Sequence, residues 1–373
     1  MKFLSYFFCF FVFIEASYCQ QLSFPYREIN ERKVVKIAAK EDFTDYVDIT
    51  SYLPKNFVKN GTVDYTDFLQ KAIDENRKVK FPNFPVLVRS IGLDVPSDTR
   101  ILFQQKSILK MISTEQANYQ LFSIINKTNV KLYNINLLGD RFRHLSNKGE
   151  WGMGLNISGS SNIKVYNPAI SECWGDGIYL GWKNRGNSNI EISGGIINNN
   201  RRNAISVISA NGLIIKNIML ANSNGVIPMS GLHFEPNDPK EDLKNIDVEN
   251  IITFNNRKGI GISNMHLIGI NNKTVSISIN NVTDYFSNLV PIHLGGHNAK
   301  YKSDIKKLNG QISIKNVKAY NANSDMLIRV DKFTDYLPNI SFENLDAIDN
   351  NVRNLQKVNK TKSQVRRNNI LIK

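Results

Sequence analysis

Seven short segments of the chain share one pattern, in which a variable residue stands between two apolar ones. The segments are LNI, IYL, ISV, LHF, IGI, IHL and IRV, and the variable residues are Asn156, Tyr179, Ser206, His233, Gly261, His293 and Arg329. Such alternation predicts strands whose apolar side chains are buried and whose intervening side chains face outward. Parallel strands lie about 4.8 Å apart, so the outward residues would form a ladder across the strands. We expect this ladder to line a groove that binds a linear polymer.

Two residues of this ladder can exchange protons with a substrate. Tyr179 and His233 stand two strands apart, roughly 10 Å between backbones, and could act on one sugar ring. Cleavage of a uronic-acid polymer by β-elimination needs a base, an acid and a group that neutralises the carboxylate. We expect His233 and Tyr179 to transfer the protons and Arg201 or Arg202 to bind the carboxylate, because a guanidinium matches its two oxygens.

Other residues near the ladder are expected to contact the polymer. They are Asn156, Trp151, Trp174, His293, Arg329, Asp140 and Arg141. The two tryptophans precede ladder strands, where they could stack on sugar faces or instead cover corners of the fold. Asp140 and Arg141 belong to the insertion Gly139–Gly149, whose charges could contact substrate or simply be solvated.

Asp176 and Glu235 are the carboxyl groups nearest to the ladder. Strand rise and strand spacing place their backbones roughly 15–20 Å apart, farther than the about 6.5–9.5 Å between the carboxyl groups of an inverting glycosidase. This estimate predicts that they do not act as partners, and Asp176 could instead form a structural salt bridge with Arg202. With only Asp140 as a further carboxylate, the sequence does not indicate a calcium site, and dependence on calcium or another cofactor stays open.

The strands that must position these residues belong to a repeat. Asn162–Gly181, NIKVYNPAISECWGDGIYLG, opens with Ile163 and Val165 followed by Asn167, and this opening returns roughly every 22 to 37 residues. A repeated strand pattern predicts a solenoid in which each turn buries its apolar face on its neighbours. An asparagine at one corner of each turn can hydrogen-bond to its copies and tolerates left-handed backbone. We therefore predict an all-β fold, a right-handed parallel β-helix.

The ends of the chain suggest export and capping. Lys2 followed by the apolar Phe3–Ile14 is typical of a signal peptide, with cleavage expected after Cys19. We expect residues 20–350 to form one β-helix domain with an N-terminal capping helix over Asp64–Ile73, followed by a basic tail at residues 351–373. Cleavage would leave Cys173 as the sole cysteine, so no internal disulfide can form.

The charge of the chain bears on its partner. The 373 residues carry a formal net charge of +14, which favours a polyanionic partner. Export to the periplasm or the exterior argues against nucleic acid and leaves an acidic polysaccharide. After the leader, no segment is long and apolar enough to be transmembrane. We expect a monomer.

The quoted residues also resemble a known superfamily. DYTDFLQKAID followed by VKFP, and the run GDRFRH, EWGMGLNISGSSNIKVYN, CWGDGIYLG and GLHFEPN, are similar to the pectin-lyase-like single-stranded right-handed β-helix superfamily, in particular to exported pectate lyases and polygalacturonases. The resemblance covers most of the mature chain. It implies the fold and a carbohydrate-active role, although this architecture also hosts hydrolases, epimerases and non-catalytic adhesins.

The resemblance also bears on the reaction. In hydrolases of the polygalacturonase type, catalytic carboxylates come from an NTD motif and a following DD pair. Asp176 of WGDG matches the aspartate of NTD, but Arg201-Arg202 stands in place of DD, and no GHG motif is recognisable near Met229–Gly231. We therefore expect a polysaccharide lyase, with a glycoside hydrolase, a C5-epimerase or a non-catalytic binding protein as alternatives.

Overall fold

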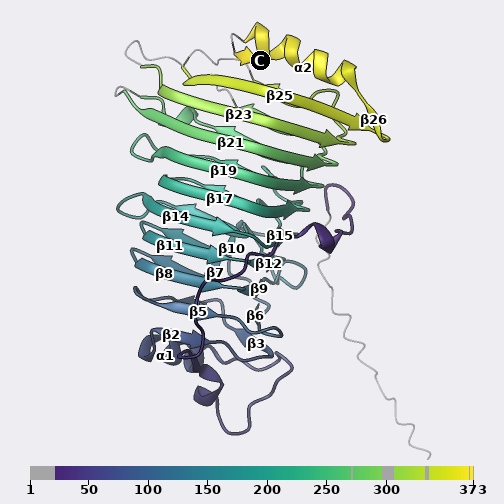
Figure 1. The fold of residues 1–373 in the computed structure, drawn as a ribbon. Coiled ribbons are helices and arrows are strands. Elements are labelled where there is room, and N and C mark those ends of the chain that lie inside the picture. The colour runs from purple at the N-terminus through teal and green to yellow at the C-terminus, as the bar shows by residue number, and fades with distance from the viewer. Residues whose placement is uncertain (1–21, 270–271, 296–305, 332–335, 369, 373) are drawn as a thin grey trace, which may run out of the picture.

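The computed structural model describes residues 22–269, 272–295, 306–331, 336–368 and 370–372 as one column of stacked turns (Figure 1). The predicted signal peptide lies outside these residues. The predicted right-handed parallel β-helix is confirmed, because strands of successive turns pair in parallel along the whole column.

One wall of the column is a nine-stranded sheet, called here the ladder sheet. Its strands are β4 (Leu93–Asp94), β7 (Asn118–Ile125), β10 (Trp151–Ser158), β13 (Ile178–Gly181), β16 (Ile205–Val207), β18 (Ser230–Phe234), β20 (Lys258–Ser263), β22 (Val290–Gly295) and β24 (Ile328–Val330). The predicted apolar flanks, such as Ile178 and Leu180, are fully buried in the coil. Their burial forces the residue between them to the outer side of the sheet.

The remaining strands form the other walls, called here the corner sheet. Its strands stack from turn to turn in two rows. The first row comprises β2 (Lys78–Lys80), β5 (Arg100–Leu102), β8 (Thr128–Tyr133), β11 (Ser161–Tyr166), β14 (Asn187–Ser193), β17 (Ala210–Ala221), β19 (Leu243–Phe254), β21 (Thr274–Tyr285), β23 (Asn309–Tyr320) and β25 (Asn339–Asp349). The other comprises β3 (Pro85–Val88), β6 (Ile108–Met111), β9 (Asn136–Leu138), β12 (Ala169–Ser171) and β15 (Ile196–Asn198), and continues into the second half of β17.

The repeated openings pair with one another as the sequence predicts. Ile163 of β11 faces Val130 of β8 on one side and Ile190 of β14 on the other. The asparagine that follows adopts left-handed backbone, with φ of 51° at Asn167, and its amide donates to Asn134 Oδ1 at 3.0 Å. These hydrogen bonds between turns fix the register on which the ladder depends.

Helices close both ends of the coil. The predicted capping helix is α1 (Thr66–Glu75), which buries Leu69, Ala72 and Ile73 against the first turns, next to β1 (Val47–Asp48) and the 3₁₀ helix η2 (Ile49–Tyr52). At the other end, the segment expected as a basic tail contains β26 (Val352–Arg353), α2 (Leu355–Arg367) and β27 (Leu371–Ile372). Helix α2 lies across the last turn (Figure 1) and is not simply solvated, because Val358 and Val365 are buried beneath it.

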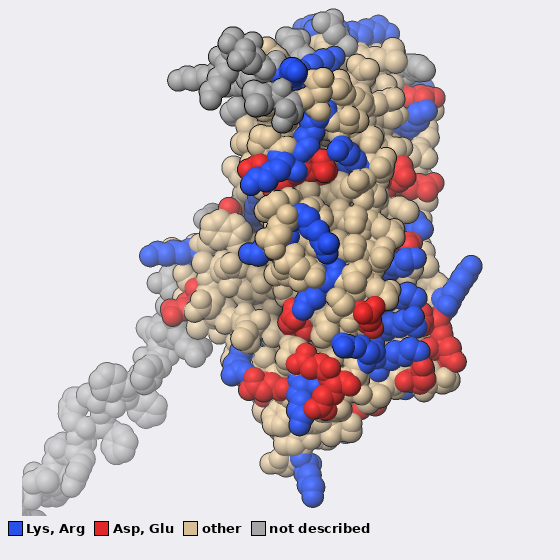
Figure 2. Space-filling model, turned by 90° about the vertical axis from the view of Figure 1, so that its left-hand side faces the viewer, with Lys and Arg blue, Asp and Glu red and all other residues tan. Residues whose placement is uncertain are grey.

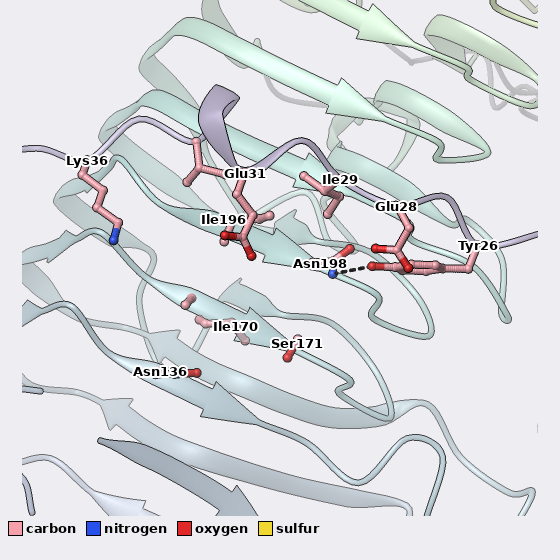
Figure 3. Close-up of a pocket in the computed structure, with 12 residues that line it drawn as sticks. Tyr26, Glu28, Ile29, Glu31, Lys36, Asn136, Ile170, Ser171, Ile196 and Asn198 are labelled. Atoms are coloured by element: carbon pink, nitrogen blue, oxygen red, sulfur yellow. Dashed lines mark hydrogen bonds between the residues drawn. The ribbon is translucent and has the colours of Figure 1, made fainter. Parts of the chain in front are cut away.

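Residues 22–45, called here the strap, run along the outside of the coil and include the 3₁₀ helix η1 (Glu31–Lys33). The Ile37 amide donates to Asn167 Oδ1 at 2.7 Å, and Asn167 donates back to the Ile37 carbonyl at 2.8 Å. Between the strap and β9, β12 and β15 lies a pocket of about 440 Å³, bordered by Tyr26 and Glu31 (Figure 3). It opens on the corner sheet, and no residue of the ladder lines it.

Candidate functional site

The ladder predicted from the sequence is confirmed in its register. Parallel pairing joins Asn156, Tyr179, Ser206, His233, Gly261, His293 and Arg329 in that order. Its members differ in exposure, since Arg329 is open to solvent while Ser206 and His233 are buried. Charged side chains that pack on the outer side of the sheet shield Ser206 and His233 from solvent.

Asp176, Arg202, Ser206 and Glu235 form a hydrogen-bonded group, called here the acid–arginine cluster. Arg202 Nη1 donates to Asp176 Oδ2 at 3.0 Å and to Glu235 Oε1 at 2.7 Å, and Nη2 donates to Glu235 Oε2 at 3.0 Å. The Ser206 hydroxyl donates to Asp176 Oδ2 at 2.7 Å. The predicted structural salt bridge between Asp176 and Arg202 is therefore confirmed.

The prediction that Asp176 and Glu235 lie too far apart to be partners is wrong. Both carboxylates accept from one nitrogen of Arg202, at 3.0 and 2.7 Å, so the two bonded oxygens are separated by less than the about 6.5–9.5 Å of an inverting pair. The estimate followed the backbone and ignored the reach of three side chains that lean toward one point. Burial raises the pKa of Asp176 to about 6, and the negative charge of Glu235 adds to this. Burial opposes ionisation of Glu235 too, but the contacts with His233 and Arg202 prevail and lower its pKa to about 2.

The bonds within this cluster also change the expected role of Arg202. Its guanidinium faces two carboxylates, and a third, Glu150, lies 3.8 Å from its Nε. Arg202 is thus already neutralised and does not offer a free positive charge to a uronate carboxylate, contrary to the prediction.

His233 lies against the outer face of the sheet beside Glu235. Its Nδ1 is 3.2 Å from Glu235 Oε2, and its Nε2 is 3.4 Å from Ser263 Oγ. The ring occupies the space above Gly261, where an added Cβ would come within 2.6 Å of His233 Cδ2. Burial lowers the pKa of His233, with the charges of Lys258 and Arg202 acting in the same direction and Glu235 opposing them. The imidazole is therefore held in its neutral form near pH 7.

Tyr179 lies two strands from His233, as predicted, and is half-buried. Its ring leans over Gly181, where an added Cβ would meet Tyr179 Cε1 at 2.4 Å. Burial raises the pKa of its hydroxyl to about 12, and the charge of Asp176 adds to the shift. The phenol therefore keeps its proton at neutral pH.

Beyond His233 the ladder continues with His293 and Arg329, which both lie near Asp331. His293 Nε2 lies 3.2 Å from Asp331 Oδ1, and Arg329 Nε lies 3.8 Å from the same oxygen. Lys258, at the start of β20, was missed because it stands just before the apolar alternation of its strand. It is 7% exposed, and within the described residues no hydrogen bond or ion pair engages its ammonium group. Burial lowers its pKa to about 8, and the adjacent charge of Arg257 contributes to this shift.

The structure does not place Asp140 and Arg141 in contact with a substrate. Asp140 is fully buried and accepts from the Tyr119 hydroxyl at 2.5 Å, while its Oδ2 lies 2.8 Å from His144 Nδ1. Arg141 is 1% exposed and donates to the carbonyls of Asn199 and Asn224. The insertion folds back on the coil, and these charges hold it there.

Trp174 and Arg201 are also part of the fold rather than of an exposed site. Trp174 is 3% exposed, with the His144 ring stacked at 3.9 Å between centroids and the Arg201 guanidinium 3.8 Å from its ring centroid. Its ring contacts are thus made within the chain, and it has no exposed face for a sugar. Arg201 also donates to the carbonyl of Gly149 at 2.7 Å, and its role in carboxylate binding stays a prediction.

Trp151 remains available at the N-terminal part of the ladder, whereas Asn156 is largely buried. Trp151 is 52% exposed at the start of β10. Asn156 is 9% exposed, and its Oδ1 accepts from Ser158 Oγ at 2.6 Å. Among the residues that the structure describes, no group of three or more His, Cys, Asp or Glu side chains converges as a metal site would require. No helix in the described ranges is long and apolar enough to cross a membrane.

The net positive charge does not form a single field. Figure 2 shows lysine and arginine interspersed with acidic and uncharged residues over the face in view. On this face the positive charge therefore acts through local groups and not through one continuous basic patch.

Comparisons with known proteins agree with the architecture. The family described as "Right handed beta helix region" matches residues 79–238. The uncharacterized protein YclG of Bacillus subtilis (strain 168) is 26% identical over 213 residues, which cover 53% of this chain and 34% of YclG. The chain thus spans about a third of the length of this curated relative.

Two solved structures share the fold at low identity. A ι-carrageenase complexed to ι-carrageenan fragments has a TM-score of 0.58 at 12% identity, covering 88% of this chain and 95% of the other. The polygalacturonase of Erwinia carotovora subsp. carotovora has a TM-score of 0.57 at 11% identity, covering 84% and 89%. With the family match and the coil itself, they show that the chain folds as a right-handed parallel β-helix.

Proposed function

We propose that this chain is an exported carbohydrate-active enzyme that binds an acidic, uronate-containing polysaccharide along the ladder and cleaves it by β-elimination. The observation that carries the proposal is the pair of proton-transfer groups on one wall. His233 and Tyr179 stand in one register-fixed column, and their pKa values are shifted in opposite directions.

These shifts match the two proton transfers of an elimination. A neutral imidazole can remove the proton beside the uronate carboxylate, and a protonated phenol can donate to the leaving oxygen. Glu235, ionised beside His233 Nδ1, is placed to stabilise the imidazolium that forms during proton removal. Trp151, exposed at the ladder's N-terminal part, offers a face for a bound sugar.

The product distinguishes the reactions. The purified protein is incubated with a panel of uronate polymers while the ultraviolet absorbance of an unsaturated uronate and the number of new reducing ends are both followed. Elimination predicts that the two rise together. Reducing ends without absorbance would replace elimination by hydrolysis, and exchange of the C5 proton without chain cleavage would indicate an epimerase.

Variants test the assigned residues. We expect His233→Gln and Tyr179→Phe each to lower turnover by about 10²–10⁴-fold, the usual contribution of a positioned acid or base. His266→Gln and Tyr166→Phe change the same residue types away from the ladder and should keep full turnover. Full activity in both ladder variants would refute the assignment. A protein that binds the polymer with no turnover on any member of the panel would support a non-catalytic binding function instead.

The acid–arginine cluster favours glycoside hydrolysis as a second candidate. Asp176 and Glu235 have pKa values of about 6 and about 2, and such a pair divides into a proton donor and an ionised carboxylate. We rank this second because Asp176 is fully buried behind Arg202 and has no path to a substrate while that salt bridge is intact.

A further inference from the structure

The pocket between the strap and the corner sheet, called here the strap pocket, lies where the strap is anchored on two sides. On one side, the Arg27 amide donates to Asn222 Oδ1 at 3.2 Å, and Asn222 donates back to the Arg27 carbonyl at 3.1 Å. On the other side, the Gly195 amide donates to the Val35 carbonyl at 2.8 Å. Within the described residues, no hydrogen bond joins residues 28–34 to the coil, so this part of the strap spans the pocket (Figure 3).

The floor of the strap pocket consists of outward side chains from three paired strands. Asn136 of β9, Ala169 of β12 and Ile196 of β15 align in register. Ser171 of β12 and Asn198 of β15 align two residues further along the same strands. Three parallel strands span roughly 10 Å. The floor therefore combines an apolar patch with hydroxyl and amide groups.

Polar side chains around the strap pocket have no partner in the protein. Glu28 and Glu31 of the strap turn their carboxylates toward the sheet, and Lys36 turns its ammonium group the same way (Figure 3). In the part of the chain that the structure describes, no hydrogen bond or ion pair engages these side chains or those of Asn136 and Ser171. Carboxylates accept hydrogen bonds, ammonium groups donate them, and amides and hydroxyls do both. The strap pocket thus offers donors and acceptors around one cavity.

This combination of groups fits an uncharged sugar. Each sugar hydroxyl can both donate and accept a hydrogen bond, and the apolar face of a sugar ring matches the apolar patch of the floor. The ring of Tyr26, 37% exposed at the edge of the pocket, offers a further surface for stacking. A uronate would bring its carboxylate toward Glu28 and Glu31, and these like charges would repel it.

We propose that the strap pocket binds an uncharged sugar unit, at a site separate from the ladder. Its volume of about 440 Å³ lies within the about 300–1,000 Å³ of small-molecule pockets. Among the residues that line the pocket none belongs to the ladder, so the site does not depend on the proposed elimination. Because the strap forms one side of the pocket, a bound sugar should also stabilise the docked strap against proteolysis.

A binding experiment with defined trisaccharides tests the site. Affinity for mannotriose, galactotriose and xylotriose, for a galacturonate trimer and for a glucosamine trimer is measured by calorimetry for the wild type, Glu31→Ala and Ala169→Arg. We expect at least one neutral trisaccharide to bind the wild type. Both variants should weaken this binding by about tenfold or more, because one removes an acceptor and the other fills the floor. Glu249→Ala, which removes an exposed glutamate from the corner sheet outside the pocket, is the matched control and should bind like the wild type.

Three results would overturn the site. They are the absence of binding by every neutral trisaccharide, binding that both variants leave unchanged, and tighter binding of the glucosamine trimer, which would indicate a site for a cation. Glu31 is exposed, so Glu31→Ala keeps the test valid should Ala169→Arg fold poorly. The variant His233→Gln separates this site from the proposed reaction, because it should lower turnover while leaving the affinity for the neutral trisaccharide unchanged.

Discussion

Replacing Arg202 by methionine would test whether the acid–arginine cluster is a buried ion network. Arg202 contacts Asp176 at 3.0 Å and Glu235 at 2.7 Å, and the side chains of these acids are 0% and 16% exposed. Removing one partner of a buried pair costs about 3–5 kcal/mol, because a charge remains without compensation. Exposed pairs contribute about 0–1 kcal/mol. The burial of Asp176 places Arg202→Met in the first class, so we expect its free energy of unfolding at neutral pH to fall by about 3–5 kcal/mol.

The loss of unfolding free energy in Arg202→Met should grow as the pH rises. The pKa of Asp176 is raised to about 6, so its neutral form favours the fold, and this contribution is lost as pH rises through about 6. Without Arg202 the two carboxylates repel each other and the pKa of Asp176 rises further. The penalty should therefore be largest near pH 8 and smaller near about pH 5, where the pair retains a proton.

Urea unfolding at the two pH values measures both quantities. Arg353→Met is the matched control, because Arg353 binds Asp346 at 2.8 Å but is 62% exposed, and it should cost no more than about 1 kcal/mol. A loss of less than about 1 kcal/mol in Arg202→Met, or a loss equal at the two pH values, would refute the reasoning.

Three further predictions concern single positions. In Gly261→Ala the new methyl group would displace the His233 ring, so turnover should fall at least about tenfold with thermal stability nearly unchanged; full turnover would contradict this. Trp174→Ala should lower the free energy of urea unfolding by about 3–5 kcal/mol, whereas Trp151→Ala should weaken polymer binding without affecting stability. The reverse pattern would indicate that Trp174 binds the substrate. Asn167→Gly removes both side-chain hydrogen bonds to Ile37 and tolerates the φ of 51°, so limited proteolysis should cut the strap faster than in the wild type; a rate equal to that of the wild type would show that these bonds do not hold the strap.

The sequence predicts the ladder well because its register follows from strict rules. Alternation assigns each residue to one face, and the repeated asparagine corner aligns each turn with the next, so Tyr179 and His233 fall in one column without knowledge of any contact. The same logic placed Arg202 one turn beyond Asp176, within reach of a salt bridge.

Side-chain reach and loop folding lie beyond those rules. Asp176 and Glu235 meet through Arg202 although they belong to turns two steps apart, and no periodic pattern encodes that convergence. Charged insertions are usually solvated, yet Asp140 is buried because Tyr119, on a preceding turn, supplies a hydroxyl donor. Asp140 and His144 stand four residues apart in the sequence, and this spacing is the one sequence feature that could have indicated their contact. The spacing alone does not show what lies beneath the loop.

Burial and the charges around His233 together set the protonation of its imidazole. Glu235 alone would raise the pKa of His233 and favour the imidazolium, which cannot accept a proton. Burial lowers the pKa of His233, and the charges of Lys258 and Arg202 add to this, so a carboxylate can lie beside the imidazole while the imidazole stays neutral. An imidazole that stays neutral is suited to proton abstraction, and this supports our ranking of the proposed elimination above hydrolysis.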